Sequence, residues 1–65
     1  MYAIQEISTG YWLVKATGGT FVPWSTNPEP NILEKATEYE LEEKLAAINE
    51  ATPGRAAIGA SPRPH

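Results

Sequence analysis

The chain contains no cysteine, and its only histidine is His65, the final residue of the sequence. Disulfides and cysteine-ligated zinc are therefore excluded, and a single histidine cannot form a multi-histidine metal site. The serines and threonines have no internal histidine to act as their base, so a Ser–Lys pair is the one nucleophilic arrangement left open. We expect neither a cofactor nor a bound metal, and we predict that the protein is not an enzyme.

Long apolar runs and basic segments are also missing. No run approaches the roughly 20 residues of a membrane-spanning helix, and residues 1–10 lack the basic and apolar regions of a signal peptide. Five Lys and Arg face eight acidic residues, all of them glutamate. Nucleic-acid-binding domains usually carry a basic stripe, so we expect no direct binding to nucleic acid and no membrane contact. Because disulfides are rare in the reducing cytosol, the absence of cysteine fits a cytoplasmic protein.

The first part of the sequence is rich in β-forming residues and predicts three strands. They cover residues 2–7, 11–17 and 20–24, with two-residue turns at Thr9-Gly10 and at Gly18-Gly19. Pro23 has no amide hydrogen, so the third strand should lie at a sheet edge or stop there. This pattern is typical of an antiparallel β-meander.

A helix is predicted after the connector at residues 25–31, and its start has two interpretations. It could run over residues 32–51, or residues 32–39 could be extended and the helix begin near residue 38. We prefer the late start because Thr37 and Glu40 have the spacing of a capping box, with Thr37 as N-cap. Leu41, Leu45 and Ile48 then form an apolar stripe along the helix.

The last segment, residues 52–65, is rich in proline and glycine and poor in large apolar residues. Pro53-Gly54 should end the helix, and the remainder is predicted to be a disordered tail that folding does not need. The predicted fold is α+β, with a three-stranded antiparallel β-meander packed on one C-terminal helix. Residues 1–51 form the domain and residues 52–65 the flexible tail.

Both faces of the predicted sheet are apolar, which raises the question of what covers the second one. Pairing through two-residue turns places Ile7 opposite Trp12 and Leu13 opposite Trp24. One face then carries Ala3, Gln5, Ile7, Trp12, Val14, Ala16 and Phe21. The other carries Tyr2, Ile4, Glu6, Tyr11, Leu13, Lys15, Thr17, Thr20, Val22 and Trp24. We assign the first face to the helix stripe. The second could be covered by residues 27–33 folding back, with Ile32 and Leu33 on it, by a second copy, or by a foreign partner.

The candidate partner-binding residues come from this second face and from the acidic helix. They are Tyr2, Tyr11, Leu13, Val22, Trp24, Glu42 and Glu43. The glutamates of this helix also have an ordinary explanation. Glu38 and Glu40 would stabilise its first turn, and Glu42 and Glu43 would lie on the solvent side of its apolar stripe. An acidic helix face could alternatively meet a basic surface on another macromolecule and compete with nucleic acid for it.

A resemblance supports the same hypothesis. The pattern of Gly10-Tyr11-Trp12, Trp24, Ala36 and Tyr39 followed by the acidic helix resembles small orphan proteins of phages and mobile elements. The resemblance implies a non-enzymatic accessory protein, often one that binds and blocks a host complex in the host cytoplasm, and it carries no catalytic residues. We therefore expect a protein–protein interaction module acting as an inhibitor. The alternative is a self-assembling accessory protein that forms a homodimer through its second sheet face.

Overall fold

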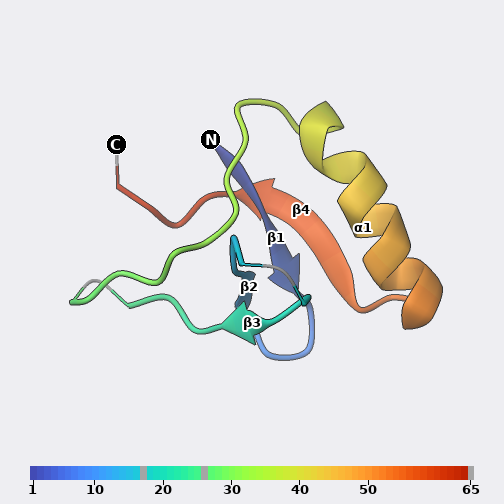
Figure 1. Cartoon of the computed structure of the whole chain (residues 1–65), viewed down its shortest axis with the longest axis horizontal. Helices are drawn as coiled ribbons and strands as arrows, with labels where there is room; N and C mark the ends of the chain where they lie inside the picture. The colour runs from blue at the N-terminus through green and yellow to red at the C-terminus, as the bar shows by residue number, and fades with distance from the viewer. Residues whose placement is uncertain (17, 26, 65) are drawn as a thin grey trace.

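The computed structural model describes residues 1–16, 18–25 and 27–64 and shows one helix beside a four-stranded antiparallel sheet (Figure 1). The strands are β1 (Tyr2–Glu6), β2 (Trp12–Leu13), β3 (Phe21–Val22) and β4 (Ala56–Ala60), in the order β3-β2-β1-β4. The helix is α1 (Tyr39–Ala51), which runs alongside β4. The predicted α+β class is confirmed, with a fourth strand added to the expected meander.

The fourth strand lies where a disordered tail was predicted. All five residues of β4 pair with β1, from Tyr2 opposite Ala60 to Glu6 opposite Ala56. The prediction for residues 52–65 is therefore wrong for this strand, while His65 lies outside the described residues. A strand at a sheet edge is held by backbone hydrogen bonds, which small residues make as well as large ones. The scarcity of large apolar side chains thus says little about pairing.

The two hairpins have longer loops than the sequence suggested. Trp12 lies opposite Gln5 instead of Ile7, and Leu13 lies opposite Phe21 instead of Trp24. The observed register differs from the predicted one by two residues in the first hairpin and by three residues in the second. Because side chains alternate between faces, only the odd shift moves a strand's side chains to the other face. Gly10, Gly18 and Gly19 do have the positive φ expected of turn glycines, and Thr17 lies outside the described residues.

The helix covers the opposite face of the sheet from the one that we assigned to it. The side chains of β1 and β2 keep their predicted faces, and the register change moves only those of β3. The helix covers the face that carries Ile4 and Leu13, where Leu41 and Ala56 complete a buried cluster. Partly buried side chains around this cluster are Tyr2, Phe21, Leu33, Leu45, Ile48 and Ile58. The predicted helix stripe is confirmed, but it packs on the face that we expected to be left open.

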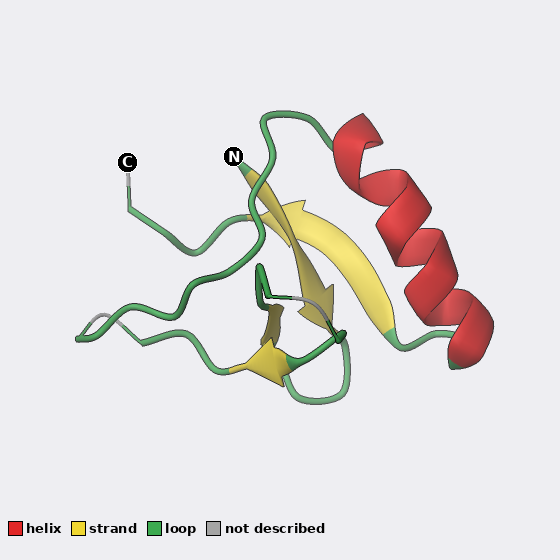
Figure 2. Ribbon diagram, viewed as in Figure 1, coloured by secondary structure: helices red, strands yellow, loops and turns green. Residues whose placement is uncertain are grey.

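The opposite face is covered by the connector between β3 and α1, which Figure 2 shows crossing back over the sheet. Ile32 is only 3% exposed and packs with Ala3 and Trp12, against which Val22 and Trp24 are also partly buried. The chain does fold back, as one of the three coverings considered from the sequence, but Ile32 lies on the face of Ala3 and Trp12 that we had assigned to the helix. Leu33 instead points to the helix side.

Backbone hydrogen bonds hold this returning segment between β1 and β2. Tyr2 exchanges two of them with Lys35, at 2.7 and 3.0 Å, and the amide of Leu33 donates to the carbonyl of Leu13 at 2.9 Å. The amide of Lys15 donates to the carbonyl of Asn31 at 2.8 Å. Residues 31–35 therefore act as a short extra strand where β1 and β2 diverge, which satisfies backbone groups that would otherwise be unpaired.

The ends of α1 agree with the late-start interpretation, apart from the cap. The helix begins at Tyr39 with Glu38 as N-cap, and no side chain caps it. The Thr37 hydroxyl donates to the Glu40 carboxylate at 3.0 Å instead of accepting from a backbone amide, so the N-cap prediction is wrong. After Ala51 the chain turns at Gly54, with φ +73°, as Pro53-Gly54 predicts. No helix in the described ranges is long and apolar enough to cross a membrane.

Candidate functional site

The residues predicted to contact a partner do not share one surface. Leu13 is 2% exposed and Tyr2 is partly buried, both in the cluster under α1. Val22 and Trp24 are half-buried on the other face of the sheet. The buried Leu13 side chain cannot reach a partner while the fold is intact, so the aromatic sheet face expected from the sequence does not exist as one site.

The remaining predicted residues are exposed, but they lie on different elements. Tyr11 is 40% exposed and lies just before β2. Glu42 and Glu43 are exposed on α1, close to its N-terminus. Of these residues, only Glu42 and Glu43 belong to a larger surface, and that surface is acidic.

That surface arises from the way in which charge is distributed over the fold. The three glutamates outside the helical region are all paired with arginine, Glu6 with Arg55 and both Glu29 and Glu34 with Arg63. The other five glutamates, at positions 38, 40, 42, 43 and 50, lie on α1 or at its N-cap and make no ion pair within the described ranges. The acidic charge of the molecule is therefore concentrated along one helix.

An aromatic side chain stands within this acidic surface. Tyr39, the first residue of α1, is 81% exposed, the most exposed of the large apolar and aromatic side chains in the described ranges. It lines a depression on the surface together with Glu40, Glu42 and Glu43. We call Tyr39, Glu40, Glu42 and Glu43 the acidic patch. Tyr39 was not predicted as a site residue, although its position outside the Leu41–Leu45–Ile48 stripe could have indicated its exposure.

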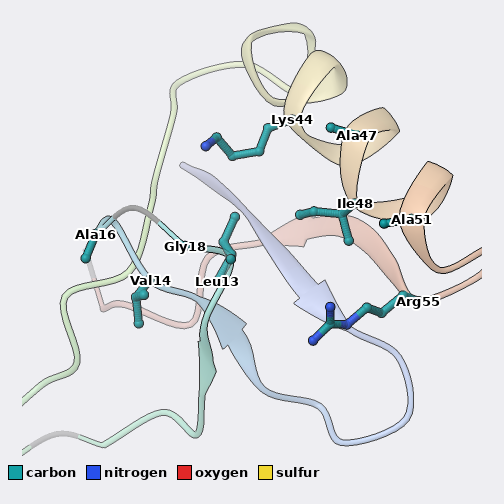
Figure 3. A pocket seen from close by; sticks show the side chains of 10 residues that line it. Leu13, Val14, Ala16, Gly18, Lys44, Ala47, Ile48, Ala51 and Arg55 are labelled. Atoms are coloured by element: carbon teal, nitrogen blue, oxygen red, sulfur yellow. The ribbon is translucent and has the colours of Figure 1, made fainter.

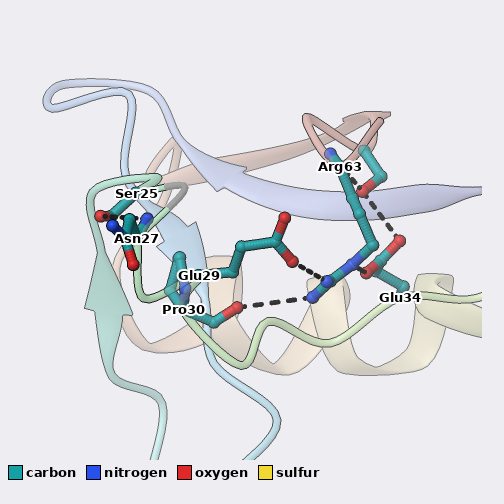
Figure 4. Close-up of polar contacts among 7 residues, drawn as sticks. Ser25, Asn27, Glu29, Pro30, Glu34 and Arg63 are labelled. Atoms are coloured by element: carbon teal, nitrogen blue, oxygen red, sulfur yellow. Dashed lines mark hydrogen bonds and ion pairs between the residues drawn. The ribbon is translucent and has the colours of Figure 1, made fainter. Parts of the chain in front are cut away.

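Arg63 joins the C-terminal segment to the connector, as Figure 4 shows. Its guanidinium pairs with both Glu29 and Glu34 and lies 5.5 Å from the centre of the Trp24 ring. The hydroxyl of Ser61 donates to Glu34 at 2.9 Å. The hydrogen bond to Glu34 is the main cause that raises the pKa of Arg63 above its usual value. These contacts explain why residues 61–63 are ordered and why Trp24 is not free.

Arg55 makes a second polar cluster, at the start of β4. Its Nε donates to Glu6 at 2.8 Å, and its guanidinium lies 4.8 Å from the centre of the Phe21 ring. Glu6 also accepts a hydrogen bond from the Thr9 hydroxyl at 2.6 Å. The bond from Thr9, followed by that from Arg55, lowers the pKa of Glu6 below its usual value. The cluster links the first turn to the strand at the other end of the chain.

A cleft of about 280 Å³ separates α1 from the segment after β2 (Figure 3). Its lining consists of Leu13, Val14, Ala16, Gly18, Gly19, Lys44, Ala47, Ile48, Ala51 and Arg55. Most of these side chains are apolar, and the two basic ones project from different sides of the cleft. The sequence analysis did not identify this site, because its residues come from three separate segments.

The arrangement of the described side chains gives little indication of metal binding. Within residues 1–16, 18–25 and 27–64 no group of three or more His, Cys, Asp or Glu side chains is placed to hold a metal ion. Comparison of the chain with known protein families, curated proteins and solved structures finds no match. Any function must therefore be argued from the surfaces themselves.

Proposed function

We propose that the protein is a small, non-enzymatic interaction module that binds a basic surface of another protein through the acidic patch on α1 and blocks it. The observation that carries this proposal is the segregation of charge. Arginine pairs with the glutamates of the sheet and connector, whereas those of the helix face solvent and make no ion pair in the described ranges. Unpaired charges of one sign steer a partner of opposite sign and favour its correct orientation.

Tyr39 supplies an aromatic contact, which charged side chains alone do not provide. Binding energy at protein interfaces is concentrated in a few residues, with tyrosine, tryptophan and arginine enriched among them. An 81% exposed tyrosine surrounded by carboxylates can insert between basic side chains, which also stack favourably on aromatic rings. The partner is therefore expected to present arginine or lysine. If that surface normally binds nucleic acid, the module competes for it.

The phage-type role follows from the same surface and from the resemblance noted in the sequence. A domain of 65 residues that covers a basic surface of a host complex would act as an inhibitor or modulator in the host cytoplasm. Self-assembly through the second sheet face is the weaker candidate. The face that motivated it, which carries Ile4 and Leu13, is covered by α1, and Ile32 from the same chain covers the opposite face.

The test is affinity capture from a bacterial host extract, comparing the wild type with Glu42→Lys and with a matched variant, Glu50→Lys. Both variants make the same charge change on exposed positions of α1, but only Glu42 belongs to the acidic patch. We expect a host protein with a basic surface that the wild type and Glu50→Lys retain and Glu42→Lys loses. Its retention should also weaken as added salt screens the charges.

Two results would contradict the proposal. One is that no protein is retained by the wild type in preference to Glu42→Lys, and the other is that retention does not respond to salt. The molecular mass in solution tests the weaker candidate separately, because a homodimer doubles it.

A further inference from the structure

The cleft between α1 and the segment after β2 is open because small residues line both of its walls. Ala47 and Ala51 face it from the helix, and Gly18 and Gly19 face it from the hairpin loop. A Cβ placed on either glycine would meet no atom within 4 Å. The space is therefore not filled by any described neighbour of these glycines.

Two basic side chains flank this space. Figure 3 shows Lys44 on one side and Arg55 on the other, with Leu13 and Ile48 between them. Lys44 makes no ion pair within the described residues. This pair of cations is notable because the protein as a whole has a net charge of −3.

Arg55 is held in place before any ligand arrives. Its Nε is bonded to Glu6 at 2.8 Å, and its guanidinium lies over Phe21 at 4.8 Å. Its two terminal nitrogens donate no hydrogen bond within the described residues, so they are available to an acceptor. Because Glu6 neutralises part of the charge on Arg55, Lys44 supplies the uncompensated positive charge. A fixed guanidinium loses little freedom when it binds a carboxylate in two-pronged fashion.

We propose that this cleft binds a free aliphatic carboxylate, with its carboxylate on the terminal nitrogens of Arg55, its hydrocarbon tail along Ala47 and Ile48, and Lys44 adding positive charge from the other side of the cleft. The volume of about 280 Å³ is near the lower limit of roughly 300–1,000 Å³ for small-ligand sites, so the tail must be of short or medium length. The proposal concerns a different surface from the acidic patch and does not depend on the proposed function.

The chemistry of the lining selects this ligand class over others. Apart from Lys44 and Arg55, none of the lining side chains can form a hydrogen bond. An aliphatic carboxylate concentrates its polar atoms at one end and leaves the rest apolar. An aliphatic cation of the same length would be repelled by both basic groups.

The experiment is a titration of the protein with sodium decanoate below its micelle concentration, followed by calorimetry and by amide chemical shifts. Decanol and decyltrimethylammonium serve as ligand controls with the same chain. We expect saturable binding of one decanoate per chain, with shifts at Leu13, Val14, Ala47 and Ile48. The two control ligands should bind at least about tenfold more weakly, a difference of about 1.4 kcal/mol.

Matched variants locate the site. Ala47→Trp fills the cleft, whereas Ala46→Trp makes the same change at an exposed helix position outside it. Ala47→Trp and Lys44→Glu should each weaken decanoate binding about tenfold or more, and Ala46→Trp should not. Circular dichroism confirms that each variant is folded. The proposal is overturned if decanoate does not bind saturably, if the cationic ligand binds as well, or if the two tryptophan variants behave alike.

Discussion

At the scale of single residues, two isoleucines three positions apart in the sequence have opposite environments. Ile4, in the middle of β1, is 0% exposed and belongs to the cluster with Leu13 and Leu41. Ile7 lies just beyond the end of β1 and is 62% exposed. Because both residues are isoleucine, a difference between their variants reports on burial and not on residue type.

Replacing each isoleucine by alanine should give very different results. Ile4→Ala should lower the free energy of unfolding by about 2–5 kcal/mol, because it removes buried methyl groups and leaves a cavity. Ile7→Ala should change it by no more than about 0.5 kcal/mol. Urea unfolding monitored by tryptophan fluorescence measures both. Equal costs for the two variants would show that the register of β1 is wrong.

Glu6 provides a prediction about pH. Its carboxylate has a pKa below the usual 4.5 in the folded protein, because the Thr9 hydroxyl and Arg55 favour the charged form. A group with a lowered folded pKa stabilises the protein above its unfolded pKa, and this stability is lost as the pH falls through the folded value. The wild type should therefore lose more stability than Glu6→Gln does when the pH is lowered from neutral to below 4.5.

Thermal unfolding over this pH range tests the prediction. The control is Glu50→Gln, because Glu50 is exposed and makes no ion pair within the described residues. Glu50→Gln should follow the wild type. If Glu6→Gln loses as much stability in acid as the wild type, the contacts of Glu6 do not contribute to folding.

At the scale of elements, the last turns of α1 and the first residue of β4 are joined by one side chain. The amide of Asn49 donates to the carbonyl of Ala56 and accepts from its N–H, both at 3.0 Å. The N–H of Ile7 donates to the carbonyl of Arg55, so the alternation of an antiparallel pair turns the backbone groups of Ala56 away from β1. Asn49 thus takes the place of a neighbouring strand at this point.

Asn49→Ala should therefore be destabilising. Ala56 is only 4% exposed, and a buried backbone group left without a partner costs about 1–3 kcal/mol. Hydrogen exchange at the Ala56 amide should accelerate, and the midpoint of urea unfolding should fall. Asn31→Ala is the control, because the Asn31 side chain is exposed and makes no hydrogen bond within the described residues. A midpoint as high as that of the control would mean that water replaces Asn49 without loss.

At the scale of the whole molecule, the two ends of the chain are neighbours. β1 begins at Tyr2, and its partner β4 ends at Ala60. Ala56 completes the buried cluster of Ile4, Leu13 and Leu41, and Ile58 packs against that cluster. A fold that depends on pairing between distant segments is complete only when both are present.

Two truncations test this dependence. Removal of residues 53–65 should abolish cooperative thermal unfolding, because β1 loses its partner and the core loses Ala56. Removal of residues 61–65 leaves β4 in place and should lower the thermal midpoint without abolishing the transition, through loss of the contacts of Arg63. Circular dichroism measures both. A cooperative transition at the wild-type temperature in the shorter chain would show that β4 is not needed.

The site could be predicted only in part. Glu42 and Glu43 were identified because a helix that buries Leu41 and Leu45 must turn its other side to solvent, and this is a local consequence of helical periodicity. Leu13 was misassigned because the helix covers its face of the sheet instead of the opposite one, and Trp24 because the connector and Arg63 contact it. Arg55 and Arg63, which pair with the glutamates of the sheet and the connector, come from a segment predicted to be disordered.

The sequence by itself determined the features that depend on neighbouring residues. These are the α+β class, the late start of the helix, its apolar stripe, and the glycines with positive φ at the turns. Each follows from local propensity or from a period of a few residues, so the distant parts of the chain cannot change it.

Only the tertiary structure decided which strands pair and which face each side chain occupies. A three-residue change of register in the second hairpin placed Phe21 on the face of Ile4 and Leu13, and Trp24 on the face of Ala3 and Trp12, the reverse of the predicted grouping. The strand of alanine and glycine became ordered because β1 and Asn49 offered hydrogen bonds to its backbone. Ile32 covered the face opposite the helix because residues 31–35 could pair between the diverging strands. These outcomes depend on backbone groups and loop lengths, which residue composition does not encode.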